Sequence, residues 1–279
     1  MNKVEVVKAD TKKTMDDFVA LPRYIYKGCA QYVPDLDMDV RATFDPKKNA
    51  GLEFSDIQPF VAYDEGGKCV GRIAAIINHR ANEKWNVSVA RFGMIEFIDD
   101  ADVSRALLTA VEQWGKARGM SRIQGPMGIS DFDKEGMLVE DFDLMGSMIS
   151  IYNPPYYPRH MEQMGFEKEV DWVSFHIDVP KAVPEKFARV TSLVQKRFGL
   201  TFKKMTKDDI LTGGYGRKIF ELLNIAYAPL FGFSELSDRQ IEDFLKQYIP
   251  IVDTRLFTGV EDRDGRLIGI AITTHSLSH

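Results

Sequence analysis

The stretch FIDDADVSRALLTAVEQWGKARGM, from Phe97 to Met120, decides the fold of this chain. It predicts the end of a strand, a tight turn and an amphipathic helix over about residues 101–118, because apolar residues recur at three- and four-residue spacing. Turns between a strand and a helix often bind phosphates, since the first backbone N–H groups of the helix are free there. This turn has no glycine and carries Asp99, Asp100 and Asp102. We therefore expect Asp100 to cap the helix with its own carboxylate.

The rest of the first 180 residues alternates predicted strands and helices. Gly66-Gly67 joins two strand-like runs and predicts a hairpin. Residues 127–151 form a long loop with acidic and apolar residues, and a loop of this length in a compact domain is often functional. Strands are expected at 4–9, 57–65, 68–79, 86–98, 121–126 and 166–179, and further helices at 10–29 and within 152–166.

Near Pro180 the order of elements restarts with a helix, a strand, two helices and a hairpin. The run GKCVGRIA at 67–74 matches GRLIGIAI at 265–272 in its two glycines and its basic second residue. We predict a domain at 1–180 and, at 181–279, the first half of a second copy. Because an unfinished sheet leaves an edge and an apolar face open, we expect a truncated chain or completion by another chain. Self-association into a homo-oligomer is one such completion.

Composition excludes several classes of protein. The chain is 44% hydrophobic and 28% charged with a net charge of −5, which is typical of a globular protein without a nucleic-acid footprint. It has no signal peptide and no apolar run of about 18 residues, so we expect a cytoplasmic protein with no membrane partner. Cys29 and Cys69 form no C-x-x-C pair, and the five histidines show no metal-binding spacing, so no metal is expected.

The order of elements is similar to that of the GNAT superfamily, the acyl-CoA N-acyltransferases. The residues that carry this resemblance are the hairpin GGKCVGRIAAI, the strand FGMIEF and the segment IYNPPYYPRHMEQMGFEK, which resembles the family's late Asn, helix, Tyr and Gly-Phe motif. More narrowly, GPMGISDFDKEGMLVEDFD followed by YNPPYY resembles a bacterial GNAT-like subgroup with duplicated units. The resemblance implies an α/β fold with a mixed, mostly antiparallel sheet flanked by helices. It also implies acetyl-CoA or another acyl-CoA as co-substrate and a small-molecule amine as acceptor.

The resemblance also implies where a cofactor would bind. In the family, the backbone of the strand before the main helix pairs with the pantetheine arm, and Asn153 fits the Asn of the late motif, although it is also a suitable helix N-cap before Pro154. The family's glycine turn for the pyrophosphate is replaced here by an acidic turn, which favours capping over phosphate binding. The strand residues implied in cofactor binding are Met94, Ile95, Phe97 and Ile98.

Two residues are implied in catalysis. Acyl transfer to an amine needs a base for the amine proton and often an acid for the departing thiolate. Glu96 is the carboxylate on the strand, and alternation places it on the face of Met94 and Ile98, either as the base of a cleft or as a surface residue. The family's acidic Tyr corresponds to Met161, so Tyr157, one turn earlier, is the candidate acid. Tyr156 and His160 are alternatives, and packing of these aromatic residues onto the sheet is an equally good interpretation.

The acidic loop leaves one further possibility open. Its carboxylates would favour a cationic or amine substrate if they converge, whereas a solvated acidic loop is the simpler interpretation. They are Asp131, Asp133, Glu135, Glu140, Asp141 and Asp143.

Two functions follow from the sequence observations taken together. The first is an acyltransferase, and the second is a non-catalytic GNAT-like binding or structural module whose active copy would lie beyond residue 279.

Overall fold

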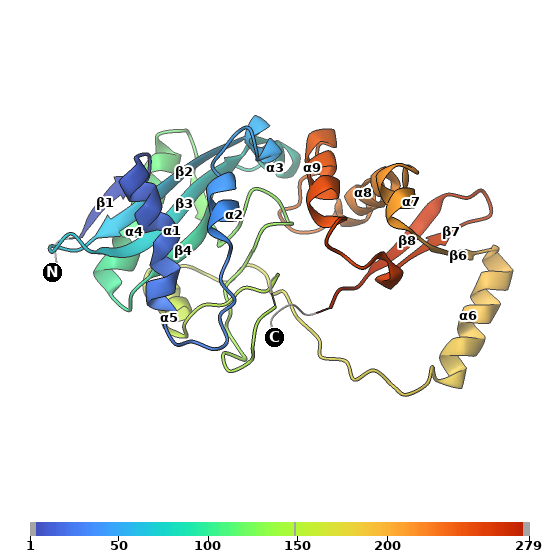
Figure 1. Cartoon of the computed structure of the whole chain (residues 1–279). Helices are drawn as coiled ribbons and strands as arrows, with labels where there is room; N and C mark the ends of the chain where they lie inside the picture. Colours follow the sequence, from blue (N-terminus) through green and yellow to red (C-terminus); the bar gives the residue numbers. More distant parts are fainter. Residues whose placement is uncertain (1–3, 148, 276–279) are drawn as a thin grey trace. The chain divides into compact units, whose positions relative to one another are not determined.

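The computed structural model describes residues 4–147 and 149–275, which form two compact units (Figure 1). The first comprises the described residues up to Val170 together with 231–234, and the second comprises 171–230 and 235–275. The boundary predicted from the sequence lies at residue 180. Each unit contains one sheet, and each is described separately below.

The first unit is built on a five-stranded sheet in the order β1-β2-β3-β4-β5. Neighbouring strands are antiparallel except β4 and β5, which are parallel. This arrangement confirms the predicted mixed, mostly antiparallel sheet. The strands are β1 Glu5–Lys8, β2 Ser55–Tyr63, β3 Cys69–Asn78, β4 Val89–Phe97 and β5 Arg122–Gln124.

Helix α4, Ala101–Lys116, covers one face of this sheet. Its fully buried Leu107 belongs to a core with Ile73 of β3 and Phe92 of β4. Asp100 is the N-cap, and its Oδ1 accepts a hydrogen bond from the Asp102 backbone amide at 2.8 Å. The predicted cap is therefore confirmed, and this amide is already satisfied by the protein's own carboxylate.

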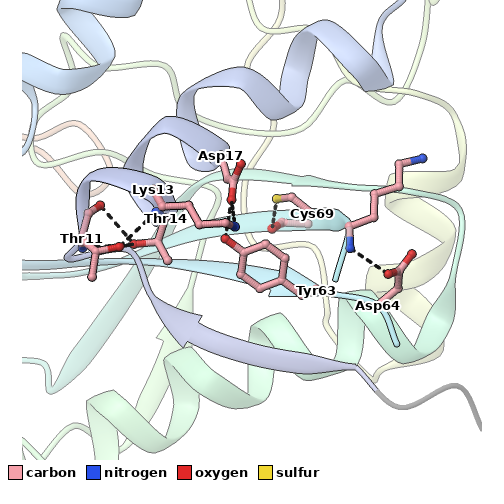
Figure 2. A network of polar contacts seen from close by, with 9 residues as sticks. Thr11, Lys13, Thr14, Asp17, Tyr63, Asp64 and Cys69 are labelled. Atoms are coloured by element: carbon pink, nitrogen blue, oxygen red, sulfur yellow. Dashed lines mark hydrogen bonds and ion pairs between the residues drawn. The ribbon is translucent and has the colours of Figure 1, made fainter. Parts of the chain in front are cut away.

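Helix α1, Lys12–Ile25, covers the opposite face. Figure 2 shows how it is tied to β2: the Tyr63 hydroxyl of β2 donates to Asp17 at 2.6 Å. Within the helix, Lys13 also donates to Asp17, at 2.8 Å. Partial burial and the bond to Asp17 raise the pKa of Tyr63 to about 12, so this hydroxyl remains a donor at neutral pH. The remaining helices of the first unit are α2 Asp37–Ala42, η1 Ala50–Glu53, α3 His79–Trp85 and α5 Tyr156–Gln163.

The second unit contains a three-stranded sheet in the order β6-β7-β8. Its β7-β8 hairpin repeats the β2-β3 hairpin closely. The turn carboxylates Asp64 and Asp262 each accept two backbone amides, and Gly67 and Gly265 have φ of 76° and 72°. The elements are α6 Glu185–Phe198, β6 Thr201–Lys204, α7 Lys207–Leu211, α8 Tyr215–Tyr227, α9 Asp238–Tyr248, η2 Thr254–Leu256, β7 Phe257–Glu261 and β8 Leu267–Ile272.

The prediction of a strand at 166–179 is wrong. None of these residues lies in a strand, and Phe175 is 82% exposed. The segment contacts β5 near its start, where Arg122 donates to Glu169 at 3.1 Å, but it forms no ladder with that strand. Alternating polarity selects a strand only where a neighbouring edge accepts the backbone hydrogen bonds and a core takes the apolar side chains.

Candidate active site

A bulge in β4 sets the geometry of the candidate site. Arg72 lies opposite Glu96 and Ala74 opposite Gly93, so two residues of β4 face one residue of β3. Met94 in this bulge has a φ of 50°, a left-handed conformation that is uncommon outside glycine. Because β5 pairs with β4 only from Val89 to Arg91, the later part of β4 has an edge that is open to side chains.

Tyr157 of α5 reaches this edge and contacts Glu96. Its hydroxyl donates to Glu96 Oε2 at 2.7 Å and accepts the Phe97 backbone amide at 2.9 Å. Its ring stacks on that of Phe97 with centroids 4.2 Å apart. Glu96 is only 8% exposed and Tyr157 only 1%. The structure therefore brings together the two residues implied in catalysis, and the interpretation of Glu96 as a surface residue is wrong.

Two residues that were not predicted from the sequence, Tyr26 and Arg72, complete the surroundings of Glu96. Tyr26, at the C-terminal end of α1, donates to the same Oε2 atom at 2.6 Å. Arg72 Nη2 lies 3.8 Å from Oε1, and Arg72 Nη1 donates to the Phe18 carbonyl at 3.0 Å. Glu96 thus has two phenol donors and one buried cation, which is how a carboxylate inside a protein is commonly stabilised.

Burial raises the pKa of three acidic groups, which are Glu96, Tyr26 and Tyr157. It raises the pKa of Glu96, whereas Arg72 and the bonds from Tyr26 and Tyr157 oppose this rise. Burial and the nearby Glu96 carboxylate raise the pKa of both Tyr26 and Tyr157. Both phenols are consequently protonated at neutral pH and able to donate.

The residues implied in cofactor binding lie in different environments. Phe97 has both backbone groups occupied, since the Tyr156 hydroxyl donates to its carbonyl at 2.5 Å and Tyr157 accepts its amide. Ile95 is buried in the core beneath α4, and Ile98 packs against that core and donates its amide to Val70. Met94 packs against the clusters on the α1 side. Placing Ile98 on the same face as Met94 is therefore wrong, because β4 ends at Phe97.

Asn153 is not the N-cap of α5, and that alternative is wrong. The N-cap is Pro155, without a side-chain hydrogen bond. Instead, Asn153 Oδ1 accepts the Leu138 amide at 2.7 Å, and Asn153 Nδ2 donates to the Leu138 carbonyl at 3.1 Å. Its amide group fastens the long loop to the segment before α5, and its role in binding a cofactor stays a prediction.

His160 joins α5 to the acidic turn and to α4. Its Nδ1 lies 2.8 Å from Ser104 Oγ, and its Nε2 lies 2.8 Å from Asp99 Oδ1. The order resembles that of a nucleophile, a base and an orienting carboxylate, but Ser104 is fully buried. Both ring nitrogens of His160 are engaged by side chains of the protein itself, so we interpret these bonds as holding the helix that carries Tyr156 and Tyr157.

The acidic loop is not uniformly solvated. Asp131 and Glu135 are partly buried near Arg91, a 4% exposed side chain that also donates to the carbonyls of Gly128 and Ile129. Burial raises the pKa of Asp131 to about 6 and that of Glu135 to about 8. Glu140, Asp141 and Asp143 are exposed. The electrostatic interaction with Arg91 thus opposes the rise in the pKa of both inner carboxylates.

One of the two missed residues had a signal in the sequence. Arg72 is a charge inside the apolar run VGRIAAII, and a charge in a buried strand requires a partner. Tyr26 had none, because a tyrosine just after a helix is unremarkable and Glu96 is 70 residues away.

No protein-family model matches the chain. Protein YghO of Escherichia coli is 33% identical over 164 residues, which cover 59% of this chain and 42% of that protein. A bacterial ceramide synthase of Caulobacter vibrioides is 26% identical over 271 residues, which cover 96% of this chain and 69% of the synthase. The chain therefore spans less than half of the first relative and about two thirds of the second.

A solved structure of a tandem GNAT protein from the clavulanic acid biosynthesis pathway matches 98% of this chain and 76% of its own, with 14% identity and a TM-score of 0.47. The chain is similar to GNAT proteins. Among the described residues, no helix is both long and apolar enough to cross a bilayer, and no three His, Cys, Asp or Glu side chains are grouped as a metal site.

Proposed function

We propose that this chain belongs to an acyltransferase that moves an acyl group from an acyl-CoA to an amine. The observation that carries the proposal is the hydrogen bond between Glu96 and Tyr157, the residues that the GNAT resemblance implies as base and acid. The ceramide synthase relative supports it, since a ceramide is an N-acylated amino alcohol and its synthesis forms an amide bond.

The proposed reaction conserves protons within this pair. The amine nitrogen attacks the thioester carbonyl, a C–N bond forms, and Glu96 takes the proton that the nitrogen loses. The C–S bond then breaks, and Tyr157 gives its proton to the departing sulfur. Because the Tyr157 hydroxyl already lies 2.7 Å from Glu96, the proton on Glu96 returns to the phenolate along that hydrogen bond. No metal or other cofactor is needed for this cycle.

The environment of Glu96 suits a base. A general base is most effective when its pKa lies near the working pH, and burial moves the pKa of Glu96 upward toward that range. Arg72 and the two phenols limit this rise in the pKa of Glu96, and their contacts hold the carboxylate in one orientation.

A second candidate function is favoured by the side chains that occupy the free edge of β4 and the start of α4. By resemblance, the pantetheine arm would pair with this strand, yet Tyr156 and Tyr157 occupy both backbone groups of Phe97, and Asp100 occupies an amide at the start of α4. A bound acyl-CoA would have to displace these side chains. The first unit would then be a binding or structural copy, and acyl transfer would belong to another part of a longer protein.

Calorimetry and a thiol-release assay separate the two candidates. The 279-residue chain would be titrated with acetyl-CoA and palmitoyl-CoA, and release of CoA thiol would be followed with a long-chain 2-amino-1,3-diol as acceptor. The first candidate predicts micromolar binding that Tyr157→Phe and Glu96→Gln preserve, together with at least a hundredfold slower release in each variant. Tyr24→Phe, at an exposed tyrosine of α1, is the matched control. Absence of binding to the wild-type chain would contradict the first candidate and support the second.

A further inference from the structure

One face of the sheet in the second unit carries an apolar row across all three strands. Phe202 of β6 lies opposite Val260 of β7, which lies opposite Gly269 of β8. Phe202 is 49% exposed, and Ala271, two residues after Gly269, is also exposed. The other face is filled, because Phe257, Leu267 and Ile270 pack into a core with residues of α7 and α8.

The first unit has the same row in the same register. Val6 of β1 lies opposite Ala62 of β2, which lies opposite Gly71 of β3. Both hairpins also shift register at the next position, between Ala62 and Tyr63 in one and between Val260 and Glu261 in the other. Each residue of one row therefore has a structural equivalent in the other.

In the first unit this row is covered by α4. Ala62 is fully buried, and Val6 packs against the cluster that contains Val103 and Leu107. A Cβ atom placed on Gly71 would lie 2.8 Å from Leu107 Cδ1 and 2.9 Å from Val103 Cγ1. The glycine thus permits the close approach of the helix to the sheet.

Gly269 has no such neighbour among the described residues. A Cβ atom there would meet only Val260, at 3.5 and 3.7 Å, which is ordinary contact. In addition, β8 pairs with β7 alone in the described sheet, so its other edge is open. In the first unit, α4 covers the glycine and the apolar row, and the edge of β3 pairs with β4, which leads into α4. The second unit has the same glycine and the same row, but the matching edge of β8 is open in the described sheet.

We propose that the row Phe202–Val260–Gly269 is the docking surface for an amphipathic helix of the α4 kind. A strand paired with the free edge of β8 carries this helix, and both come from the same gene product outside residues 1–279. Branched aliphatic side chains four residues apart, as Val103 and Leu107 are, face Gly269. The matched region covers only 69% of the ceramide synthase relative, which therefore contains polypeptide that could supply such a strand and helix. This proposal does not depend on the proposed acyl transfer.

The test compares Gly269→Val with Gly71→Val in the 279-residue chain and in the product of the complete reading frame. We expect Gly71→Val to lower the Tm of both proteins. Gly269→Val should leave the Tm of the 279-residue chain unchanged and lower that of the complete product by several degrees. Hydrogen exchange should show β8 amides that are slower in the complete product.

Three outcomes would overturn the proposal. The first is a complete product whose Tm does not respond to Gly269→Val. The second is a reading frame that adds no strand and helix. The third is a 279-residue dimer that Gly269→Val dissociates, since a second copy of the chain would then be the occupant.

Discussion

Tyr157 and Glu96, 61 residues apart in the sequence, are joined by a 2.7 Å hydrogen bond inside the first unit. The Tyr157 hydroxyl also accepts the Phe97 amide, so one phenol satisfies a buried carboxylate and a buried backbone group. The stability of the unit and the proposed chemistry therefore depend on the same atom, and substitutions here should be measured for both.

Tyr157→Phe should destabilise the chain more than Tyr26→Phe. Both variants remove one donor to Glu96 Oε2, but only Tyr157→Phe also leaves the Phe97 amide without its acceptor. An unsatisfied buried polar group costs about 1–3 kcal/mol. Urea unfolding of the two variants measures the difference. An equal loss in both would show that the Phe97 amide finds another acceptor.

Arg72→Met should lower the free energy of unfolding by about 3–5 kcal/mol, because it leaves Glu96 without its cation in a buried site. Adding Glu96→Gln should recover part of this loss, since a neutral amide no longer needs the cation. Arg23→Met, which removes an exposed ion pair with Asp37, is the matched control and should change stability by less than about 1 kcal/mol. Additive effects of Arg72→Met and Glu96→Gln would contradict a direct interaction.

Asp100→Ala should cost about 0.5–2 kcal/mol because the first turn of α4 loses its cap. Asp100→Asn should cost less, since an amide oxygen can accept the same hydrogen bond from Asp102. Thermal unfolding of both variants provides the measurement. If Asn were as harmful as Ala, the contribution of Asp100 would come from its charge near the helix N-terminus rather than from the cap.

Stability should fall with rising pH because of Glu135. Burial, with Asp131 adding to it and Arg91 opposing it, raises the pKa of Glu135 from 4.5 to about 8. The folded state thus binds the proton more tightly than the unfolded state, so the stabilisation is fully present below about pH 4.5 and is lost as pH rises to about 8. Relative to Glu135→Gln, the wild type should lose a few kcal/mol across this window.

Urea unfolding at several pH values tests this prediction, and Glu140→Gln, at an exposed position of the same loop, is the matched control. Parallel pH profiles for the wild type and Glu135→Gln would contradict it.

Features that depend on neighbouring residues were predictable from the sequence, whereas contacts between residues far apart in the sequence were not. The Asp100 cap and the Gly66-Gly67 hairpin depend on neighbours a few residues away, and both are present. The resemblance placed Glu96 and Tyr157 in one site, but it did not predict that Tyr26 would donate to the same carboxylate oxygen. Such contacts depend on how helices pack on a sheet, and no local pattern encodes that packing.

The strand predicted at 166–179 is a case in which a clear local pattern gave a wrong prediction. Its alternating pattern is clear, but a strand is a property of two chain segments, and the described residues provide no ladder for this one. The alternative of Asn153 as a helix cap fails for a similar reason. Its amide satisfies Leu138, in a loop whose path the sequence does not predict.

The bulge at Met94 decides on which face of the sheet the Glu96 carboxylate lies. Gly93 and Glu96 are three residues apart, yet they lie opposite Ala74 and Arg72, which are two residues apart on β3 and share a face. If β4 paired without the bulge, every position after Gly93 would lie on the other face. The Glu96 carboxylate would then point into the apolar layer under α4, and the Phe97 ring would turn toward α1. The extra residue of this one bulge thus sets the side of the sheet on which the candidate site forms.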